Sequence, residues 1–237
     1  MLVLAVETST DRSSVALVDQ DGVVAEASLG VPRRHGEFVA PAIAFCLDQA
    51  NLTPDDISGV AVGLGPGLYT GLRVGIATAQ SFATARNLPM VGMSGLDVLA
   101  FQARHTRRLI CATLDARRGQ LFWALYRCAP GGVQRLSDLR VGRPDELTAE
   151  LDSVGEHCLV LGDGGLRHRG ALEGAVDVDV AEGGRATPDA GDLGALAVPR
   201  FIREETERPG TMTPIYLRQV DAAIGWQERG RMQAGQG

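Results

Sequence analysis

The sequence predicts an α/β fold whose first half holds three short strands followed by alternating helices and strands. Three apolar segments near the N-terminus have the length and composition of strands, at residues 2–7, 14–19 and 23–29. The pair Asp21-Gly22, between the last two segments, is a typical hairpin turn. Beyond it, apolar residues recur at helical spacing over residues 38–50, and strand and helix patterns then alternate as far as residue 103. Alternation of this kind is typical of the α/β class.

The first predicted helix carries one apolar stripe, whose i, i+1, i+4, i+5 spacing is typical of an amphipathic helix. Its members are Phe38, Val39, Ala42, Ile43, Cys46, Leu47 and Ala50. Pro41 fits the first turn of such a helix, where no backbone N–H is needed. The next segment, Thr53-Pro54-Asp55-Asp56, places a cap, a proline and two acids in the order that starts a short second helix.

The remaining elements follow from strand patterns, small-residue helix patterns and turn signals. In the first half we expect strands at residues 60–64 and 90–93 and helices at residues 71–86 and 95–103. The arginine-rich segment at residues 104–108 marks an expected domain boundary. After it we expect a hairpin of residues 109–114 and 120–126, a strand at 159–161, and helices at 144–151 and 189–201. A charged loop at 204–213 and a partly flexible C-terminal tail at 219–237 complete the chain.

Composition and charge limit the class of protein. The 237 residues are 45% hydrophobic and 22% charged, as in an ordinary globular chain with a sizeable core. A formal net charge of −6 opposes autonomous binding of nucleic acid, although arginines cluster at residues 104–108 and 117–118. No apolar run reaches the roughly 20 residues that span a bilayer, and the N-terminus has no signal-peptide pattern. We therefore expect a cytoplasmic protein without membrane contact.

The segment that we call the glycine loop joins a predicted strand to a predicted helix. It reads Gly65-Pro66-Gly67-Leu68-Tyr69-Thr70-Gly71-Leu72-Arg73-Val74-Gly75. Its glycines permit close approach to phosphate or to another backbone segment, Thr70 is the expected N-cap, and Arg73 follows it. A Walker-type P-loop needs a lysine, and all 23 basic residues of the chain are arginine. The loop therefore predicts a close approach but does not identify the group that approaches.

Glu7, Thr8 and Ser9 follow the first predicted strand and have two interpretations. In the first, the carboxylate and hydroxyl groups form a vestigial phosphate loop near nucleotide phosphate or a magnesium-bound water. In the second, the hydroxyl groups cap a tight turn and Glu7 pairs with an arginine. The first would suit an autonomous ATP-dependent small-molecule kinase. For its second phosphate loop the chain offers only Gly162-Asp163-Gly164-Gly165, which more often turns a strand into a helix.

Several segments together resemble the bacterial TsaB (YeaZ) family. They are residues 4–10, 13–17, the glycine loop, 115–124 and 214–218. Leu68 stands where that family usually has a serine. The resemblance implies an actin/Hsp70/sugar-kinase-like (ASKHA) fold with two lobes, the second of them reduced. It also implies a partner-binding N-terminal lobe at residues 1–104, a smaller α/β lobe at 105–218 and the tail at 219–237.

The resemblance also implies a function. Members of the family are the dimerisation subunit of the machinery that makes threonylcarbamoyladenosine at the adenosine following the anticodon of tRNA. This chain would be a non-catalytic subunit that binds the catalytic subunit TsaD, is joined by the ATPase subunit TsaE, and reaches tRNA through the complex. Alone it would form a homodimer through the same surface. It would need no cofactor of its own. Whether a nucleotide binds near the subunit interface of the complex is left open.

The expected interface is the apolar surface of two helices. Its residues are Phe38, Val39, Ala42, Ile43 and Leu47 on the first helix, with Leu72, Ile76 and Ala79 on the helix after the glycine loop. Gly75, Ala79 and Ala83 add a smooth ridge at i, i+4, i+8, on which another helix can pack closely.

No metal site is expected. The catalytic relative TsaD holds its metal with a His-x-x-x-His pair on one helix face, because two imidazoles one turn apart converge on one ion. Here His35 is followed at i+4 by Val39, and the other histidines are far away in sequence.

Overall fold

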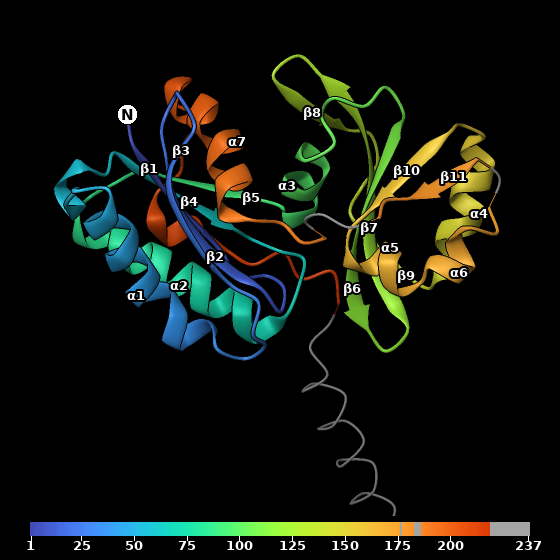
Figure 1. Cartoon of the computed structure of the whole chain (residues 1–237), viewed down its shortest axis with the longest axis horizontal. Helices are drawn as coiled ribbons and strands as arrows, with labels where there is room; N and C mark the ends of the chain where they lie inside the picture. The colour runs from blue at the N-terminus through green and yellow to red at the C-terminus, as the bar shows by residue number, and fades with distance from the viewer. Residues whose placement is uncertain (176, 183–185, 219–237) are drawn as a thin grey trace, which may run out of the picture.

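The computed structural model describes residues 1–218 apart from residue 176 and residues 183–185. Two sheets form two lobes that lie side by side, with α3, Gly95–Phe101, between them (Figure 1). The predicted tail at residues 219–237 lies outside the described residues. Within the described ranges, none of the helices has both the length and the apolar character that crossing a membrane requires.

The first lobe is built on a five-stranded sheet in the order β3-β2-β1-β4-β5. Its strands are β1 Val3–Glu7, β2 Ser13–Val18, β3 Val23–Leu29, β4 Gly59–Gly63 and β5 Met90–Met93. β2 pairs antiparallel with β3 around Asp21-Gly22, which confirms the predicted hairpin. β1 is antiparallel to β2 and parallel to β4. One face is covered by α1, His35–Gln49, and α2, Tyr69–Ala85; the other is covered by α7, Ala190–Ile202 (Figure 1).

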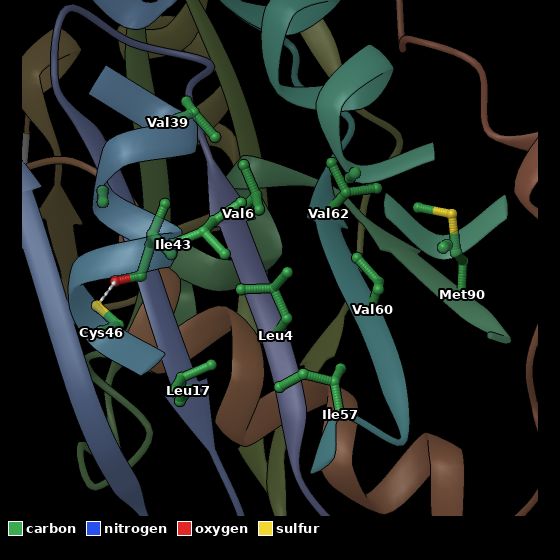
Figure 2. Packing of buried hydrophobic residues seen from close by; sticks show 14 of the residues in the cluster. Leu4, Val6, Leu17, Val39, Ile43, Cys46, Ile57, Val60, Val62 and Met90 are labelled. Carbon is green, nitrogen blue, oxygen red and sulfur yellow. Dashed lines mark hydrogen bonds between the residues drawn. The ribbon is translucent and has the colours of Figure 1, made fainter. Parts of the chain in front are cut away.

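The central strand β1 is apolar at successive positions because both faces of the sheet are covered. Leu4 and Val6 belong to the core under α1 and α2, whereas Val3 and Ala5 belong to the core under α7. Figure 2 shows the first pair packed between α1 and the neighbouring strands. Burial of each large apolar side chain contributes about 1.5–3 kcal/mol, so these two cores hold the lobe together.

The second lobe is built on a six-stranded sheet in which β11-β10-β6-β7-β8 are neighbours and β9 pairs with β7. Its strands are β6 Leu109–Arg117, β7 Gln120–Ala129, β8 Gly132–Arg135, β9 Arg140–Gly142, β10 Cys158–Leu161 and β11 Val178–Val180. Its helices are α4 Pro144–Val154, α5 Asp163–Arg167 and α6 Arg169–Leu172. The predicted hairpin is β6–β7, with a turn shorter than expected. The sequence analysis missed β8, β9, β11, α5 and α6, which span only three to five residues each and are too short to show a period.

The chain returns to the first lobe after completing the second. α7 packs on the first sheet, Met212 is buried in the core under α1 and α2, and the Ile215 N–H donates to the Leu64 carbonyl at 2.8 Å. The prediction that residues 105–218 form one lobe is therefore wrong for the last part of that range. Helical spacing predicts that residues 189–201 form a helix, but it does not say which sheet the helix covers.

α1 begins earlier than predicted. It starts at His35, so that Pro41 lies inside the helix instead of in its first turn. The hydrogen bond that Pro41 cannot make to the Glu37 carbonyl falls where both residues are exposed, and water can replace it. The short second helix is a single 3₁₀ turn, Pro54–Asp56, in which the Thr53 N–H donates to the Asp56 carboxylate at 2.7 Å.

Candidate functional site

The glycine loop packs directly on the loop that follows β1. A Cβ atom at Gly67 would overlap the Ser9 carbonyl, and a Cβ atom at Gly71 would overlap the Thr8 carbonyl. The Leu68 N–H donates to the Ser9 carbonyl at 2.7 Å, and the Thr8 hydroxyl donates to the Gly71 carbonyl at 2.8 Å. The close approach that the sequence predicts is therefore an approach of two segments of this chain to each other.

This packing covers the residues predicted as a vestigial phosphate loop. Glu7, Thr8 and Ser9 are all buried, with at most 2% of each exposed. One carboxylate oxygen of Glu7 accepts from the Ser9 N–H at 2.6 Å, and the other lies against Gly63, where a Cβ atom would overlap it. The hydroxyl and carboxylate groups thus face the protein's own backbone and side chains. The Thr8 hydroxyl contacts the glycine loop instead of capping a tight turn, and Ser9 Oγ has no hydrogen-bond partner among the described residues.

Glu7 is a buried acid whose second oxygen has no hydrogen-bond partner among the described residues. Burial raises the pKa of Glu7 from 4.5 to about 6, and hydrogen bonds from Ser9 lower it only in part. The neutral form of Glu7 is therefore favoured in the folded protein up to about pH 6. Glu7 stabilises the fold fully below its unfolded pKa, and this contribution is lost as the pH rises through about 6.

We expect Glu7→Gln to remove this pH dependence. From about pH 4 to about pH 8, the free energy of unfolding of the wild-type chain should fall by about 2 kcal/mol relative to that of the variant. Urea denaturation followed by circular dichroism at several pH values measures the difference. Parallel pH profiles for the two proteins would show that the pKa of Glu7 is the same in the folded and unfolded states.

The start of α2 differs from the prediction. Leu68, not Thr70, is the N-cap residue, and no side chain caps the helix. Thr70 is exposed in the first turn. A leucine cannot accept a hydrogen bond from the first turn, so the position where the TsaB family usually has a serine is the position where a serine would cap the helix. Arg73 lies over the Tyr69 ring, 4.1 Å from its centre, and donates to the Tyr216 hydroxyl at 3.3 Å.

Most of the predicted interface residues lie in the core of the first lobe. The α1 residues Val39, Ala42, Ile43 and Leu47 and the α2 residues Leu72, Ile76 and Ala79 are each at most 7% exposed. Phe38 is half-buried, and the ridge residues Gly75 and Ala83 are buried. The apolar stripe of each helix covers the first sheet, and Figure 2 shows this for Val39 and Ile43 of α1. These side chains therefore offer a partner little surface.

A different set of residues forms the solvent side of the same two helices, and we call it the outer helix face. It consists of Pro41, Ala44 and Phe45 on α1 and Ala77, Ser81 and Ala85 on α2. Phe45 is 55% exposed and is the largest apolar side chain in the set. It borders a hollow of about 320 Å³ between α1 and the edge strand β3.

Two signals in the sequence could have identified the outer helix face. Ala77, Ser81 and Ala85 have the same i, i+4, i+8 spacing as the predicted ridge, two residues further along the helix. Phe45 is a large aromatic residue that falls outside the apolar stripe of α1. A helix residue of this kind has no place in the core and is therefore a candidate for contact with a partner.

His35 is a structural residue. It is 4% exposed, its Nδ1 lies 2.6 Å from the Ser13 hydroxyl oxygen, and burial lowers its pKa. Val39, one turn later, is in the core. Across the part of the chain that the structure describes, no three histidine, cysteine, aspartate or glutamate residues are grouped so that they could hold a metal ion.

Comparisons with known proteins agree with this architecture. A family model described as "TsaD: tRNA N6-adenosine threonylcarbamoyltransferase" matches residues 8–148. The tRNA threonylcarbamoyladenosine biosynthesis protein TsaB of Bacillus subtilis is 30% identical to this chain over 235 residues, which cover 96% of the chain and 99% of the relative.

Solved structures are similar at two levels. YeaZ from Pseudomonas aeruginosa has 27% sequence identity and a TM-score of 0.78, covering 91% of this chain and 99% of its own. A ROK hexokinase from Thermus thermophilus has 10% identity and a TM-score of 0.50, covering 86% of this chain and 100% of its own, and is similar in fold alone. The predicted ASKHA fold class is confirmed. By sequence and structure together, the chain belongs to the TsaB (YeaZ) family of tRNA threonylcarbamoyladenosine biosynthesis proteins.

Proposed function

We propose that this chain is a non-catalytic scaffold that binds the catalytic subunit TsaD through the outer helix face and so promotes threonylcarbamoyl transfer to tRNA. The proposal rests on two observations taken together: the glycine loop covers Glu7, Thr8 and Ser9, and α1 and α2 expose a helix face rich in small residues. The ATPase subunit TsaE joins the assembly, and the chain has no cofactor of its own. In the absence of TsaD the same face supports a homodimer.

The first support is that both loops with the position of phosphate loops are filled by this chain. The glycine loop covers Glu7, Thr8 and Ser9, as described above. In the second lobe, the Gly165 N–H donates to the Thr113 hydroxyl at 2.7 Å, and a Cβ atom at Gly164 would meet the Leu114 backbone. Nucleotide turnover by the isolated chain would require both loops to move.

The second support is the chemistry of the outer helix face. Small side chains at Ala44, Ala77, Ser81 and Ala85 let another helix approach α1 and α2 closely. Phe45 and the hollow beside it offer an apolar contact at the edge of the face. A partner that binds here more tightly in its active conformation than in its inactive one is shifted toward the active conformation without any catalytic group from this chain.

A glutamate on the outer helix face should abolish partner binding without unfolding the lobe. We expect Ala77→Glu to weaken binding to TsaD at least about 100-fold, because the carboxylate would be desolvated in a close helix contact. Isothermal titration measures the affinity, and thermal unfolding reports the fold. The matched control is Ala149→Glu, an exposed alanine on α4 in the second lobe, which should bind as the wild type does. Equal affinities for the two variants would place the interface elsewhere.

The function itself is tested by reconstitution. A tRNA modification assay with TsaD, TsaE, threonine, bicarbonate, ATP and the enzyme that makes the adenylate should need this chain, and this chain without TsaD should give no product. Full activity without it would overturn the proposal. Turnover of magnesium-ATP by the isolated chain would favour the small-molecule kinase instead.

A further inference from the structure

A hollow with a volume of about 700 Å³ lies where α1 and α2 both begin, and we call it the helix-start hollow. Arg33 and His35 line it from the start of α1, and Thr70 and Gly71 line it from the first turn of α2. Of the described residues, 7–9 do not line it. A ligand can therefore enter the helix-start hollow while the glycine loop stays packed on the loop after β1.

Both helices offer unpaired backbone N–H groups at the helix-start hollow. The N–H groups of the first helical turn have no partner within a helix, and here no side chain caps either α1 or α2. The two helices have 15 and 17 residues, so each start carries the partial positive charge of a full helix dipole. Two such helix starts beside one cavity favour an anion.

The ionised side chains that line the helix-start hollow carry a net positive charge. Asp11 and Arg117 line it as an ion pair, with 2.5 Å between a carboxylate oxygen and a guanidinium nitrogen, so their charges cancel. Arg33 is exposed and has no ion pair or hydrogen bond with any other described residue. The charge of Arg33 is therefore available to a ligand.

His35 adds an independent observation, because it is a buried polar side chain with one unused nitrogen. It is 4% exposed, and its Nδ1 lies 2.6 Å from the Ser13 hydroxyl oxygen. Its Nε2 has no hydrogen-bond partner among the described residues and lies toward Gly71, where a Cβ atom would be 3.2 Å away. When the Ser13 hydroxyl donates to Nδ1, the neutral ring carries its proton on Nε2, which is then a donor without an acceptor.

We propose that the helix-start hollow binds a phosphate group, either free or as the monoester of a small molecule. A phosphate has oxygens in a tetrahedral arrangement, so it can accept at once from two helix starts, the Arg33 guanidinium and the Thr70 hydroxyl. The two oxygens of a carboxylate lie in one plane and match fewer of these donors. One water molecule takes up about 30 Å³, so the volume of the hollow also leaves room for the organic part of an ester.

The first test titrates the full chain with two probes, inorganic phosphate and glycerol 3-phosphate. Isothermal titration in a buffer without phosphate, at matched ionic strength, measures both affinities. We expect binding with a Kd on the order of 1 mM or below. Tighter binding of glycerol 3-phosphate would support an ester as the ligand, and tighter binding of inorganic phosphate would support the free ion.

Thr70→Glu should remove phosphate binding while the chain stays folded. The new carboxylate would lie in the first turn of α2, where the helix dipole stabilises it and where it competes with the phosphate. We expect at least about a 10-fold loss of affinity for both probes and an unchanged or higher Tm. The matched control is Thr84→Glu, which makes the same change at an exposed position near the other end of α2 and should bind phosphate as the wild type does.

Arg33→Gln tests the guanidinium by itself. We expect affinity for both probes to fall about 3- to 10-fold, because a charge-assisted hydrogen bond at an exposed position is lost. The matched control is Arg34→Gln, since Arg34 already pairs with Glu37 at 2.6 Å and does not line the hollow. This control should bind both probes as the wild type does.

Two results would overturn the inference: no binding of either probe by the wild-type chain at about 10 mM, or equal affinities for Thr70→Glu and Thr84→Glu. The inference goes beyond the proposed function, because the site belongs to this chain alone. The two proposals therefore fail separately. Thr70→Glu should bind TsaD as the wild type does, and Ala77→Glu should bind phosphate as the wild type does.

Discussion

Replacing Ala79 by glutamate should unfold the first lobe. Ala79 is fully buried in the core under α1 and α2, so the new carboxylate would lie among apolar side chains with no solvent. An uncompensated buried charge costs about 3–5 kcal/mol, a large part of the roughly 5–15 kcal/mol by which a typical domain is stable. Urea denaturation and the near-ultraviolet circular dichroism spectrum would show the loss.

The control for this prediction lies on the same helix. Ala77→Glu makes the same chemical change two residues earlier, where the side chain is exposed. We expect its unfolding free energy to stay within about 0.5 kcal/mol of the wild type. If Ala79→Glu instead remained folded and lost only TsaD binding, the buried face of α2 would be the interface, as the sequence analysis expected.

Gly71→Val should be the second strongly destabilising change. Gly71 lies in the first turn of α2, where a Cβ atom would overlap the Thr8 carbonyl and lie 3.2 Å from Nε2 of His35. Because the carbonyl belongs to the backbone, the whole loop after β1 would have to move, and we expect a loss of about 3 kcal/mol or more in unfolding free energy. Chemical denaturation of purified protein measures it.

Gly36→Val is the matched control for Gly71→Val. Gly36 also lies in the first turn of a helix, α1, and a Cβ atom there would meet nothing within 4 Å. The control should therefore change stability by less than about 1 kcal/mol. Similar losses in both variants would mean that β-branching in a first turn, and not the overlap with Thr8, causes the effect.

The sequence predicted the first lobe well because the residues within each of its elements are sufficient to predict that element. The hairpin turn Asp21-Gly22, the stripe of α1 and the small-residue pattern of α2 each determine an element without reference to distant residues. The glycines also predicted a close approach correctly. At Gly71, however, glycine is required because the Thr8 carbonyl lies too close for a Cβ atom, and not because of the backbone angles. Only the three-dimensional structure reveals that neighbour.

The candidate site was predicted less well, because a stripe does not show what covers it. Ile43 and Ala79 have the spacing of a contact surface, and they do form one, with the first sheet of the same chain. Apart from Pro41 and Phe45, the outer helix face is made of small residues, which give a weak signal in any hydrophobicity pattern.

The return of α7 to the first lobe determines when that lobe can be completed during synthesis. A ribosome releases β1 through α3 first, then the whole second sheet, and only then the helix Ala190–Ile202 that covers the far side of β1. Until then Val3 and Ala5 border an uncovered apolar surface. The nascent N-terminal half therefore exposes apolar surface for as long as translation of the second sheet takes, and a stop codon within that sheet would leave an aggregation-prone fragment instead of a smaller, independent domain.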